Sequence, residues 1–467
     1  MIKFRLDKVN NSFWEIRVVM GSIRIVTKPP GPKARKIVAE TKRVLSPSIL
    51  RNYPLVIDRA HDCLVKDVDG NQFIDFNAGI AVLGVGSTNE KVTEAAVRQL
   101  EKFTHYSYTD FYYENINELA EKLIEIYPRE KGKVSKQVFY GNSGTEANEA
   151  AIKLARYSTK RQRIMAYTSS FHGRTMGTMS LTSSKPAQVR GFSPLLPGVE
   201  HVPFPYCYRC PLKMEYPECG FACIDFIQEQ YFDKYVPPDE VAAFFIESIQ
   251  GEGGYVVPPD DYFRELFKRF KKYGILFVDD EVQSGLGRTG KWFGIEHFGV
   301  VPDMITVAKA LAAGLPIGAL IARADLMTWE PGSHASTFGG NPVSAAAALA
   351  SLQFIEENEL LENARKQGAY MLKIFKEWEK KYEIVGNVRG KGLMIGIEIV
   401  KDKKKKEFGI EEAKEIVDIC WKKGVLLITC GKSTLRVVPP LTITRDLIDE
   451  ALEVIESAIA QVNKAAT

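Results

Sequence analysis

Through its middle, the chain alternates short apolar runs with longer stretches in which apolar residues recur at helical spacing. A short and continuously apolar run is typical of a strand that is buried on both faces of a sheet. Five such runs stand out, at residues 138–140, 164–167, 241–246, 275–278 and 304–308, and a helical pattern covers residues 146–157. Strands that alternate with helices predict a mostly parallel α/β sheet with covering helices.

The two ends of the chain show other patterns. Residues 64–68 and 72–76 are separated by Asp69-Gly70-Asn71, which predicts a hairpin because Asp-Gly is a strong turn signal. Towards the C-terminus the pattern predicts helices over residues 343–356, 360–381, 411–422 and 445–462, and a strand over residues 388–398. Residues 1–36 pass through a proline-rich stretch and are expected to lie over another subunit or domain, and Met20 is an alternative start.

The candidate chemistry lies where two of the central strands end. The run at residues 275–278 leads into Asp279, Asp280 and Glu281, and the run at residues 304–308 leads into Lys309. Open α/β sheets build their sites at the carboxyl ends of strands, so this acid and this amine are expected to meet. A desolvated lysine condenses with an aldehyde, and pyridoxal phosphate (PLP) also needs a carboxylate at its ring nitrogen. The pair fits that cofactor, and equally a structural ion pair at the edge of the sheet.

A family resemblance decides between these two interpretations. Residues 280–290, DEVQSGLGRTG, together with Lys309 in AKALAAG, resemble the motifs of the class III, ornithine/4-aminobutyrate type aminotransferases. The resemblance covers nearly the whole chain, with one departure at Ser87, where the family usually has histidine. It implies the fold type I arrangement of PLP enzymes, with a large PLP-binding domain at residues 89–338. Residues 1–88 then form an N-terminal segment and part of a smaller α+β domain, which residues 339–467 complete.

The resemblance also assigns roles in cofactor binding. Lys309 would hold PLP as a Schiff base and then move the proton between substrate and cofactor, and Asp280 would keep the ring nitrogen protonated. A turn that begins a helix can hold phosphate through its unpaired N–H groups, although most such turns only cap the helix. The other cofactor residues expected from the motifs are Ser143, Gly144 and Thr145 at the phosphate, Phe171 stacked on the ring, His172 beside it, Gln283 at the ring hydroxyl oxygen, and the partner subunit's Thr337.

A second set of residues would bind the substrates. Ile80 is expected to line the entrance, and Arg174 to take the far carboxylate of a dicarboxylic acid through its bidentate fork. Glu247 and Glu252 lie beside a glycine-rich turn, where carboxylates can also serve in acid–base catalysis. In the resembled family the second glutamate is instead a gate. It pairs with an arginine, here Arg436, while an ω-amine is bound, and releases that arginine for 2-oxoglutarate.

Composition and charge exclude several classes of protein. Lys and Arg number 62 against 58 Asp and Glu, without a basic stripe carrying interleaved aromatic residues, so nucleic acid is not an expected partner. No apolar stretch reaches the roughly 18 residues that a membrane span needs, and residues 1–26 lack the core of a signal peptide. We therefore expect a cytoplasmic protein without a membrane partner. The length of 467 residues favours two domains.

Four of the seven cysteines cluster, as Cys207-x2-Cys210 and Cys219-x3-Cys223. Seven cysteines are too few for a disulfide scaffold in a chain of this length. The spacing is compatible with a structural zinc site, with disulfides of a hyperthermophile protein, or with a cysteine-rich loop that binds nothing. We expect a local structural role, and the spacing does not choose the bond.

Taken together, the motifs predict an aminotransferase that moves the amino group of an ω-amino acid to 2-oxoglutarate. We expect 4-aminobutyrate as the donor, with ornithine, N-acetylornithine and lysine as alternatives, and a homodimer or a dimer of dimers. An amino-acid racemase or epimerase on the same scaffold is a further alternative, but it has less use for Arg174 and for the Glu252/Arg436 gate. A non-catalytic binding protein is disfavoured by the presence of both Lys309 and Asp280.

Overall fold

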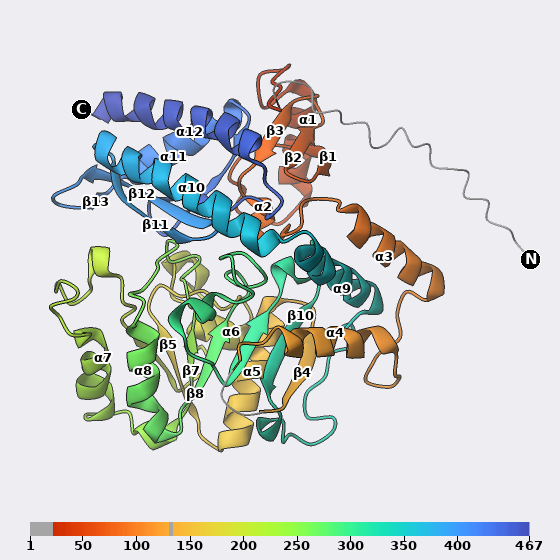
Figure 1. Cartoon of the computed structure of the whole chain (residues 1–467), viewed down its shortest axis with the longest axis vertical. Helices are drawn as coiled ribbons and strands as arrows, with labels where there is room; N and C mark the ends of the chain where they lie inside the picture. The colour runs from red at the N-terminus through yellow and green to blue at the C-terminus, as the bar shows by residue number, and fades with distance from the viewer. Residues whose placement is uncertain (1–21, 130–133, 467) are drawn as a thin grey trace, which may run out of the picture.

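The computed structural model describes residues 22–129 and 134–466, and Figure 1 shows their arrangement. A large sheet with its helices occupies the lower half of that view, and the N-terminal strands and the C-terminal elements occupy the upper half. No helix in the described part of the chain combines the length and apolarity needed to cross a membrane. Residues 1–21, which include Met20, lie outside the described residues. The expectation that residues 1–36 lie over another subunit or domain can therefore be compared with the structure only for residues 22–36.

The large sheet has seven strands in the order β4-β10-β9-β8-β7-β5-β6. All neighbours are parallel except β10, which runs antiparallel to both β4 and β9. The mostly parallel α/β sheet expected from the sequence is therefore confirmed, and β6 and β10 are strands that the pattern did not indicate. The strands are β4 (Lys136–Gly141), β5 (Arg163–Tyr167), β6 (Val199–Val202), β7 (Val241–Ile246), β8 (Leu276–Asp280), β9 (Met304–Val307) and β10 (Gly318–Arg323).

Helices cover both faces of this sheet. Successive strand residues point to opposite faces, so Phe244 and Phe277 join the core on one side and Phe245 joins the core on the other. On the first side they pack with α8 (Tyr262–Phe270), and on the second with the alanine-rich face of α5 (Gly144–Thr159). The other helices of this half are α3 (Glu90–Lys102), α4 (Glu114–Glu125), α6 (Met176–Leu181), α7 (Ala222–Ile227) and α9 (Pro342–Glu357).

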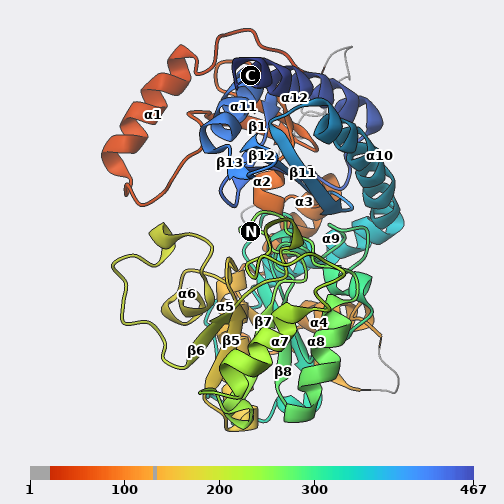
Figure 2. The ribbon, with the colours of Figure 1, turned by 90° about the vertical axis from the view of Figure 1, so that its left-hand side faces the viewer.

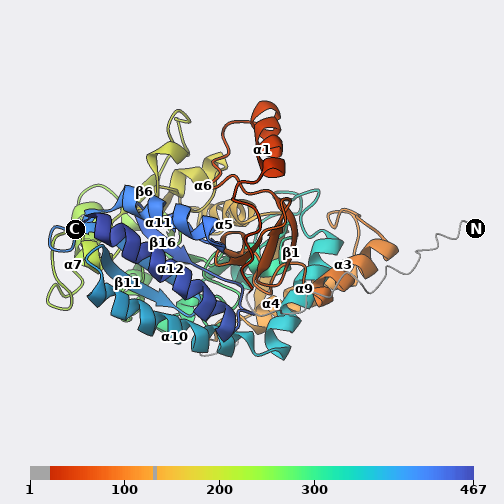
Figure 3. The same cartoon turned by 90° about the horizontal axis from the view of Figure 1, so that it is seen from above.

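The C-terminal part forms an antiparallel sheet covered by three helices. The sheet contains β11 (Val385–Lys391), β12 (Met394–Asp402), β16 (Thr434–Val437) and β15 (Ile428–Cys430), and β13 (Glu407–Phe408) pairs with β12. Seen from above, α11 (Ile410–Lys422), α12 (Arg445–Ala466) and α10 (Leu360–Lys381) lie side by side (Figure 3). The strand expected over residues 388–398 is wrong as one element. The chain reverses near Gly392, whose φ of +53° is a conformation that glycine adopts most easily. This reversal divides the stretch between β11 and β12.

The N-terminal strands share a sheet with the C-terminal part. The predicted hairpin is confirmed: β2 (Leu64–Asp67) pairs antiparallel with β3 (Gln72–Asp75), and β1 (Ile57–His61) pairs with β2. On its other edge β3 pairs in parallel with β14 (Val425–Leu426), a strand from the far end of the chain. Strands from both ends of the sequence thus belong to one four-stranded sheet.

Residues 22–36 lie partly against this sheet and partly apart from it. The backbone N–H groups of Ser22 and Ile23 donate to the carboxylate of Glu450 on α12, and Arg24 forms a bridge with Gln72. Helix α1 (Pro32–Val44) then begins at a proline, which is favoured in the first turn of a helix, and it projects from the molecule in Figure 2. The short helix α2 (Ala78–Ala81) follows β3.

Candidate active site

Asp280 and Lys309 meet at the carboxyl ends of two neighbouring parallel strands. Asp280 is the last residue of β8 and pairs with Thr306 of β9, and the chain continues from β9 through Ala308 to Lys309. Both side chains line one cavity of about 400 Å³. The strand register therefore brings the predicted acid and amine to the same site.

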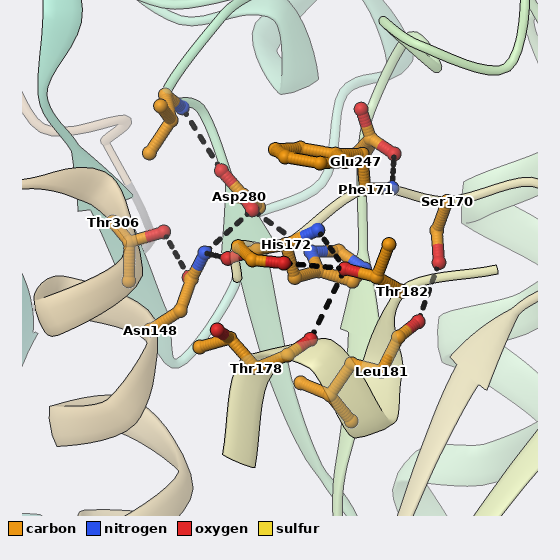
Figure 4. A network of polar contacts seen from close by, with 12 residues as sticks. Asn148, Ser170, Phe171, His172, Thr178, Leu181, Thr182, Glu247, Asp280 and Thr306 are labelled. Carbon is orange, nitrogen blue, oxygen red and sulfur yellow. Dashed lines mark hydrogen bonds and ion pairs between the residues drawn. The ribbon is translucent and has the colours of Figure 1, made fainter. Parts of the chain in front are cut away.

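The Asp280 carboxylate is held mainly through one of its oxygens, as Figure 4 shows. Oδ2 accepts a hydrogen bond from Asn148 Nδ2 at 2.7 Å and lies 2.8 Å from His172 Nδ1. Oδ1 accepts from the Val282 backbone N–H at 3.1 Å. Asn148 also donates to the His172 carbonyl and accepts from the Thr306 hydroxyl. Because Oδ1 has one protein donor, it keeps capacity for a donor in the cavity.

Sequence reasoning missed Asn148, although the chain carries a signal for it. Asn148 is almost fully buried on the face of α5 that otherwise presents alanines to the sheet. A buried amide needs partners, so one asparagine on an apolar helix face points to a polar group beneath it. Here that group is Asp280.

His172 is a buried neighbour of the acid rather than a free base. Burial opposes its protonation, but the hydrogen bond to Asp280 and the charge of that carboxylate outweigh this, so the pKa of His172 is raised. Its Nε2 has no hydrogen-bond partner among the described residues. The structure thus places directly behind the carboxylate an imidazole whose protonation Asp280 stabilises.

Lys309 occupies a strained position at the cavity. Its φ is +44°, a conformation that non-glycine residues rarely adopt, and among the described residues none accepts a hydrogen bond from its amine. Burial and then the nearby charge of Arg436 lower the pKa of Lys309 from its usual range. A lowered pKa makes the free amine available nearer neutral pH.

The start of α5 lies at the same cavity. Ser143 is the N-cap, and its hydroxyl accepts a hydrogen bond from the Glu146 N–H, so that hydroxyl serves the helix itself. Gly144 and Thr145 form the first turn and line the cavity. A Cβ at Gly144 would lie 2.8 Å from a Val282 side-chain carbon, so only glycine lets the helix start this close to the end of β8. Unpaired N–H groups and the positive end of a 16-residue helix suit an anion here.

The remaining residues expected at the ring also line the cavity. Phe171 contributes its ring, and its backbone N–H donates to Glu247 Oε1 at 3.0 Å. Gln283 accepts at Oε1 from the Tyr255 hydroxyl at 2.9 Å. Glu247 also accepts from the Gly251 N–H at 2.8 Å, and burial raises the pKa of Glu247 to about 7. Glu247 therefore ties two backbone turns together at the edge of the site.

Glu252 and Arg436 form an ion pair, although neither lines the cavity itself. The Arg436 guanidinium is buried, donates through Nη2 to Glu252 Oε1, and lies with Nη1 3.5 Å from Gln283 Oε1. Lys185 contacts the other Glu252 oxygen at 3.4 Å. Burial of Glu252 opposes its ionisation, but the charges of Arg436 and Lys185 outweigh this and lower its pKa to about 2. The pair lies directly behind Gln283.

Arg174 lines the cavity from its exposed side. Its guanidinium carbon lies 5.8 Å from the centre of the Phe171 ring, and it forms no ion pair with a described residue. Within residues 22–129 and 134–466, Arg174 is thus a cation without a carboxylate partner at the mouth of the site. A free arginine fork can accept a carboxylate there.

Two further predicted site residues, like Glu252 and Arg436, do not line this cavity. Ile80 is 37% exposed with a φ of +65°, and Val82 lines the cavity instead. The reason is the left-handed backbone at Gly79 and Ile80, which turns the Ile80 side chain to another direction. Thr337 is exposed and lies outside the cavity of its own chain. Its expected role needs a second subunit.

The four clustered cysteines lie together around a small cavity, lined by Cys207, Cys210, Cys219 and Cys223. All four are free thiols, and no group of three or more potential ligands in the described residues is arranged to hold a metal ion. Burial raises the pKa of Cys207 to about 11 and that of Cys223 to about 12, so these thiols stay protonated near neutral pH. The described residues thus show four free thiols around one small cavity, and their local structural role stays a prediction.

The cavity fits PLP in the character of the groups around it. An amine without a hydrogen-bond partner, a carboxylate with a free lone pair, an aromatic ring and a helix start are all present on its wall. These groups match an aldehyde, a ring nitrogen, a ring face and a phosphate, respectively. Lys309, Asp280, Phe171 and the turn at Gly144 would hold the cofactor.

Comparisons with known proteins agree with this site. Residues 47–459 match the model of the family described as aminotransferase class-III. The chain is 44% identical to the leucine/methionine racemase of Thermococcus litoralis, over 88% of this chain and 92% of that protein. It is 40% identical to the probable 4-aminobutyrate aminotransferase of Bacillus subtilis, over 84% and 90%.

A solved structure shows the same architecture. The (S)-enantioselective ω-transaminase of Thermomicrobium roseum superimposes with a TM-score of 0.85 and 32% identity, covering 92% of this chain and 99% of that one. The fold is therefore the fold type I arrangement of PLP-dependent transaminases. With its PLP site and a family match over most of its length, the chain belongs to the class III aminotransferases.

Proposed function

We propose that the enzyme is an aminotransferase that moves the amino group of an ω-amino acid to 2-oxoglutarate. The observation that carries this proposal is the Glu252–Arg436 pair behind Gln283, together with the unpaired Arg174 at the mouth of the cavity. A transaminase binds two substrates in turn, one with a single carboxylate and one with two. A breakable pair lets one pocket offer either a neutral or a cationic wall.

The donor that we expect is 4-aminobutyrate, and ornithine, N-acetylornithine and lysine are the alternatives. With Glu252 on Arg436, the inner wall is close to neutral and suits the uncharged middle of an ω-amino acid. With the pair open, Arg436 and Arg174 would take the two carboxylates of 2-oxoglutarate. Release of Glu252 is feasible because Lys185 offers its carboxylate a second cation.

In the reaction, bound PLP supplies the aldehyde and the electron sink. Lys309 supplies the amine and, at its Nζ, carries the proton between the substrate carbon and the cofactor. Its lowered pKa suits both roles, since a base of pKa near the working pH accepts and returns a proton readily. Asp280 would place negative charge at the ring nitrogen of the bound cofactor, and Asn148 and His172 fix the orientation of the Asp280 carboxylate.

We further propose a homodimer or a dimer of dimers, in which the partner subunit's Thr337 reaches the cofactor phosphate. The exposed aromatic side chains of Tyr106, Phe111, Tyr112 and Phe338 support it, because such residues are typical of covered surfaces. A mixture of Lys309→Ala and Thr337→Ala chains would regain part of the activity if sites are shared between subunits. Mixed chains without any regained activity would contradict shared sites.

An amino-acid racemase is the second candidate, and the 44% identity to a leucine/methionine racemase favours it. A racemase acts on one α-amino acid and needs no co-substrate. It would use Lys309 and Asp280 in the same way, but it has less use for a pair that opens to bind a second carboxylate. The two candidates therefore differ in whether 2-oxoglutarate is consumed.

A two-sided assay decides between them. In the first assay, purified enzyme is incubated with one ω-amine and 2-oxoglutarate, and the glutamate formed is measured. In the second, it is incubated with one L-amino acid alone, and the optical rotation is measured. We expect glutamate from an ω-amine, and Arg174→Gln to weaken 2-oxoglutarate use at least tenfold. Arg190→Gln, which changes an exposed arginine outside the cavity, is the matched control. Loss of rotation without glutamate formation would establish the racemase instead.

A further inference from the structure

The loop that carries Glu252 is held from across the molecule by one arginine. This loop, residues 251–255, which we call the gate loop, follows β7 in the large half of the chain. Arg389 belongs to β11 in the C-terminal sheet. Its Nη2 donates to the Gly254 carbonyl at 2.6 Å, and its Nε donates to the Tyr255 carbonyl at 3.2 Å. Two of the three guanidinium nitrogens, Nη2 and Nε, thus hold the backbone just after Glu252.

The gate loop needs an external hold because its backbone is strained. Tyr255 has a φ of +52°, which its Cβ atom makes unfavourable, and Gly254 has a φ of +126°, which glycine adopts readily. A Cβ at Gly254 would lie 3.3 Å from Arg389 Nη2, so glycine leaves room for the fork. Strain of this kind persists only where surrounding contacts fix the chain.

The buried carboxylate of Glu398 holds the Arg389 guanidinium in place. Glu398 on β12 is 1% exposed, and its Oε2 lies 2.8 Å from Arg389 Nη1. Its other oxygen pairs with Arg209, and the Tyr206 hydroxyl also donates to this carboxylate. Arg209 and Tyr206 belong to the cysteine-rich loop, which is thereby fastened to the C-terminal sheet. Arg389 therefore has one arm on Glu398 and two donors left for the gate loop.

The clamped residues surround the ion pair. The Glu252 carbonyl accepts from the Gly431 N–H at 2.8 Å, and the Tyr255 hydroxyl donates to Gln283, which Arg436 also approaches. The Arg436 guanidinium carbon lies 5.4 Å from the centre of the Tyr255 ring. Displacing Tyr255 or Gly254 would therefore change where the Glu252 carboxylate can lie.

We infer that Arg389 is a positioning residue for substrate selection: its fork on Gly254 and Tyr255 keeps Glu252 on Arg436. This rests on the proposed role of that pair. Loosening the fork frees Arg436, so ligands with a second carboxylate should gain over ligands with one. In Arg389→Lys the side chain would keep a positive charge beside Glu398. Its single ammonium group cannot pair with Glu398 and also donate to both carbonyls of the gate loop.

The test compares two unreactive inhibitors, glutarate with two carboxylates and butanoate with one. Their inhibition constants are measured in Arg389→Lys, Glu252→Gln and the double variant. We expect the preference for glutarate over butanoate to rise at least fivefold in both single variants. The preference for glutarate should rise no further in the double variant than in Glu252→Gln alone, because the fork acts through Glu252.

A matched control separates gating from stability. Arg209→Gln weakens the same Glu398 cluster but leaves the fork on the gate loop, so it should lower the melting temperature without changing the glutarate preference. An unchanged preference in Arg389→Lys, or equal changes in Arg209→Gln and Arg389→Lys, would overturn the inference. Inhibition can be measured on glutamate formation or on racemisation, so failure of the proposed function would not be mistaken for failure of the clamp.

Discussion

Asn148 donates its side-chain amide to Asp280 Oδ2 at 2.7 Å, the same oxygen that His172 Nδ1 approaches at 2.8 Å. One oxygen of the Asp280 carboxylate is thus held from two elements, α5 and the turn after β5. The other oxygen is left for the cofactor. Orientation of the acid thus depends on an asparagine that donates to it from a neighbouring helix.

Asn148→Asp should impair the enzyme by placing a second carboxylate beside Asp280. Like charges raise the pKa of such a pair, so Asp280 would hold the ring proton less well. We expect at least a tenfold fall in turnover and a changed pH dependence of the cofactor absorption. Thr306→Val removes only the hydroxyl that donates to Asn148 and should have a much smaller effect. Equal effects of the two variants would contradict this role.

Protein stability should depend on pH through Glu247. Burial raises its pKa to about 7 in the folded chain, against a usual value near 4.5, so the folded state binds the extra proton between these values. Its contribution to stability is fully present below pH 4.5 and is lost as the pH rises through 7. In Glu247→Gln, melting temperatures of the cofactor-free protein between pH 5 and 8 should lack that loss. A variant that keeps the wild-type profile would show that another group titrates.

Glu398→Gln should destabilise the fold substantially. Removing one partner of a buried charge cluster leaves Arg209 and Arg389 uncompensated, which typically costs about 3–5 kcal/mol. Glu357→Gln breaks an exposed pair with Lys91 and should cost about 0–1 kcal/mol. Denaturant unfolding of both variants measures the difference. A loss for Glu398→Gln as small as that for Glu357→Gln would show that the cluster is replaceable.

The cofactor-free enzyme should capture PLP at nearly its maximal rate at pH values where the side chain of a free lysine is still protonated. Burial, and then the charge of Arg436, lower the pKa of Lys309, and the free amine is the reacting form. Arg436→Met should therefore move the pH–rate profile to higher pH. Lys291→Met, which changes a cation outside the cavity, should leave the profile in place.

The sequence predicted the centre of the site because that centre follows from strand order. Asp280 and Lys309 each end a continuously apolar run, and parallel neighbours place such ends together. The turn at Gly144 was predictable because a glycine and a capping serine precede a helical pattern. These are local signals, carried by residues adjacent in the chain.

The remainder depends on contacts between distant residues. Arg389 reaches the gate loop from more than a hundred positions away, Glu398 holds Arg389 there, and no local pattern marks either residue. The left-handed backbone at Gly79 and Ile80, with Val82 lining the cavity, was not predictable from the local pattern, and the role of Ile80 at the substrate entrance stays a prediction. Strand β10 was missed although its residues 319–322 form a continuously apolar run like those of the other central strands. The partner's contribution at Thr337 stays a prediction.

The parallel pairing of β14 with β3 sets an order for making this protein. Val425 joins Ile74, so the N-terminal hairpin waits with one edge unpaired until the ribosome has added most of the chain. The strands of the large sheet all lie between residues 136 and 323, and they can assemble long before that. A nascent chain released before residue 425 would keep an open strand edge, the feature that most readily recruits another chain into aggregates. Complete synthesis is therefore also the step that protects the hairpin.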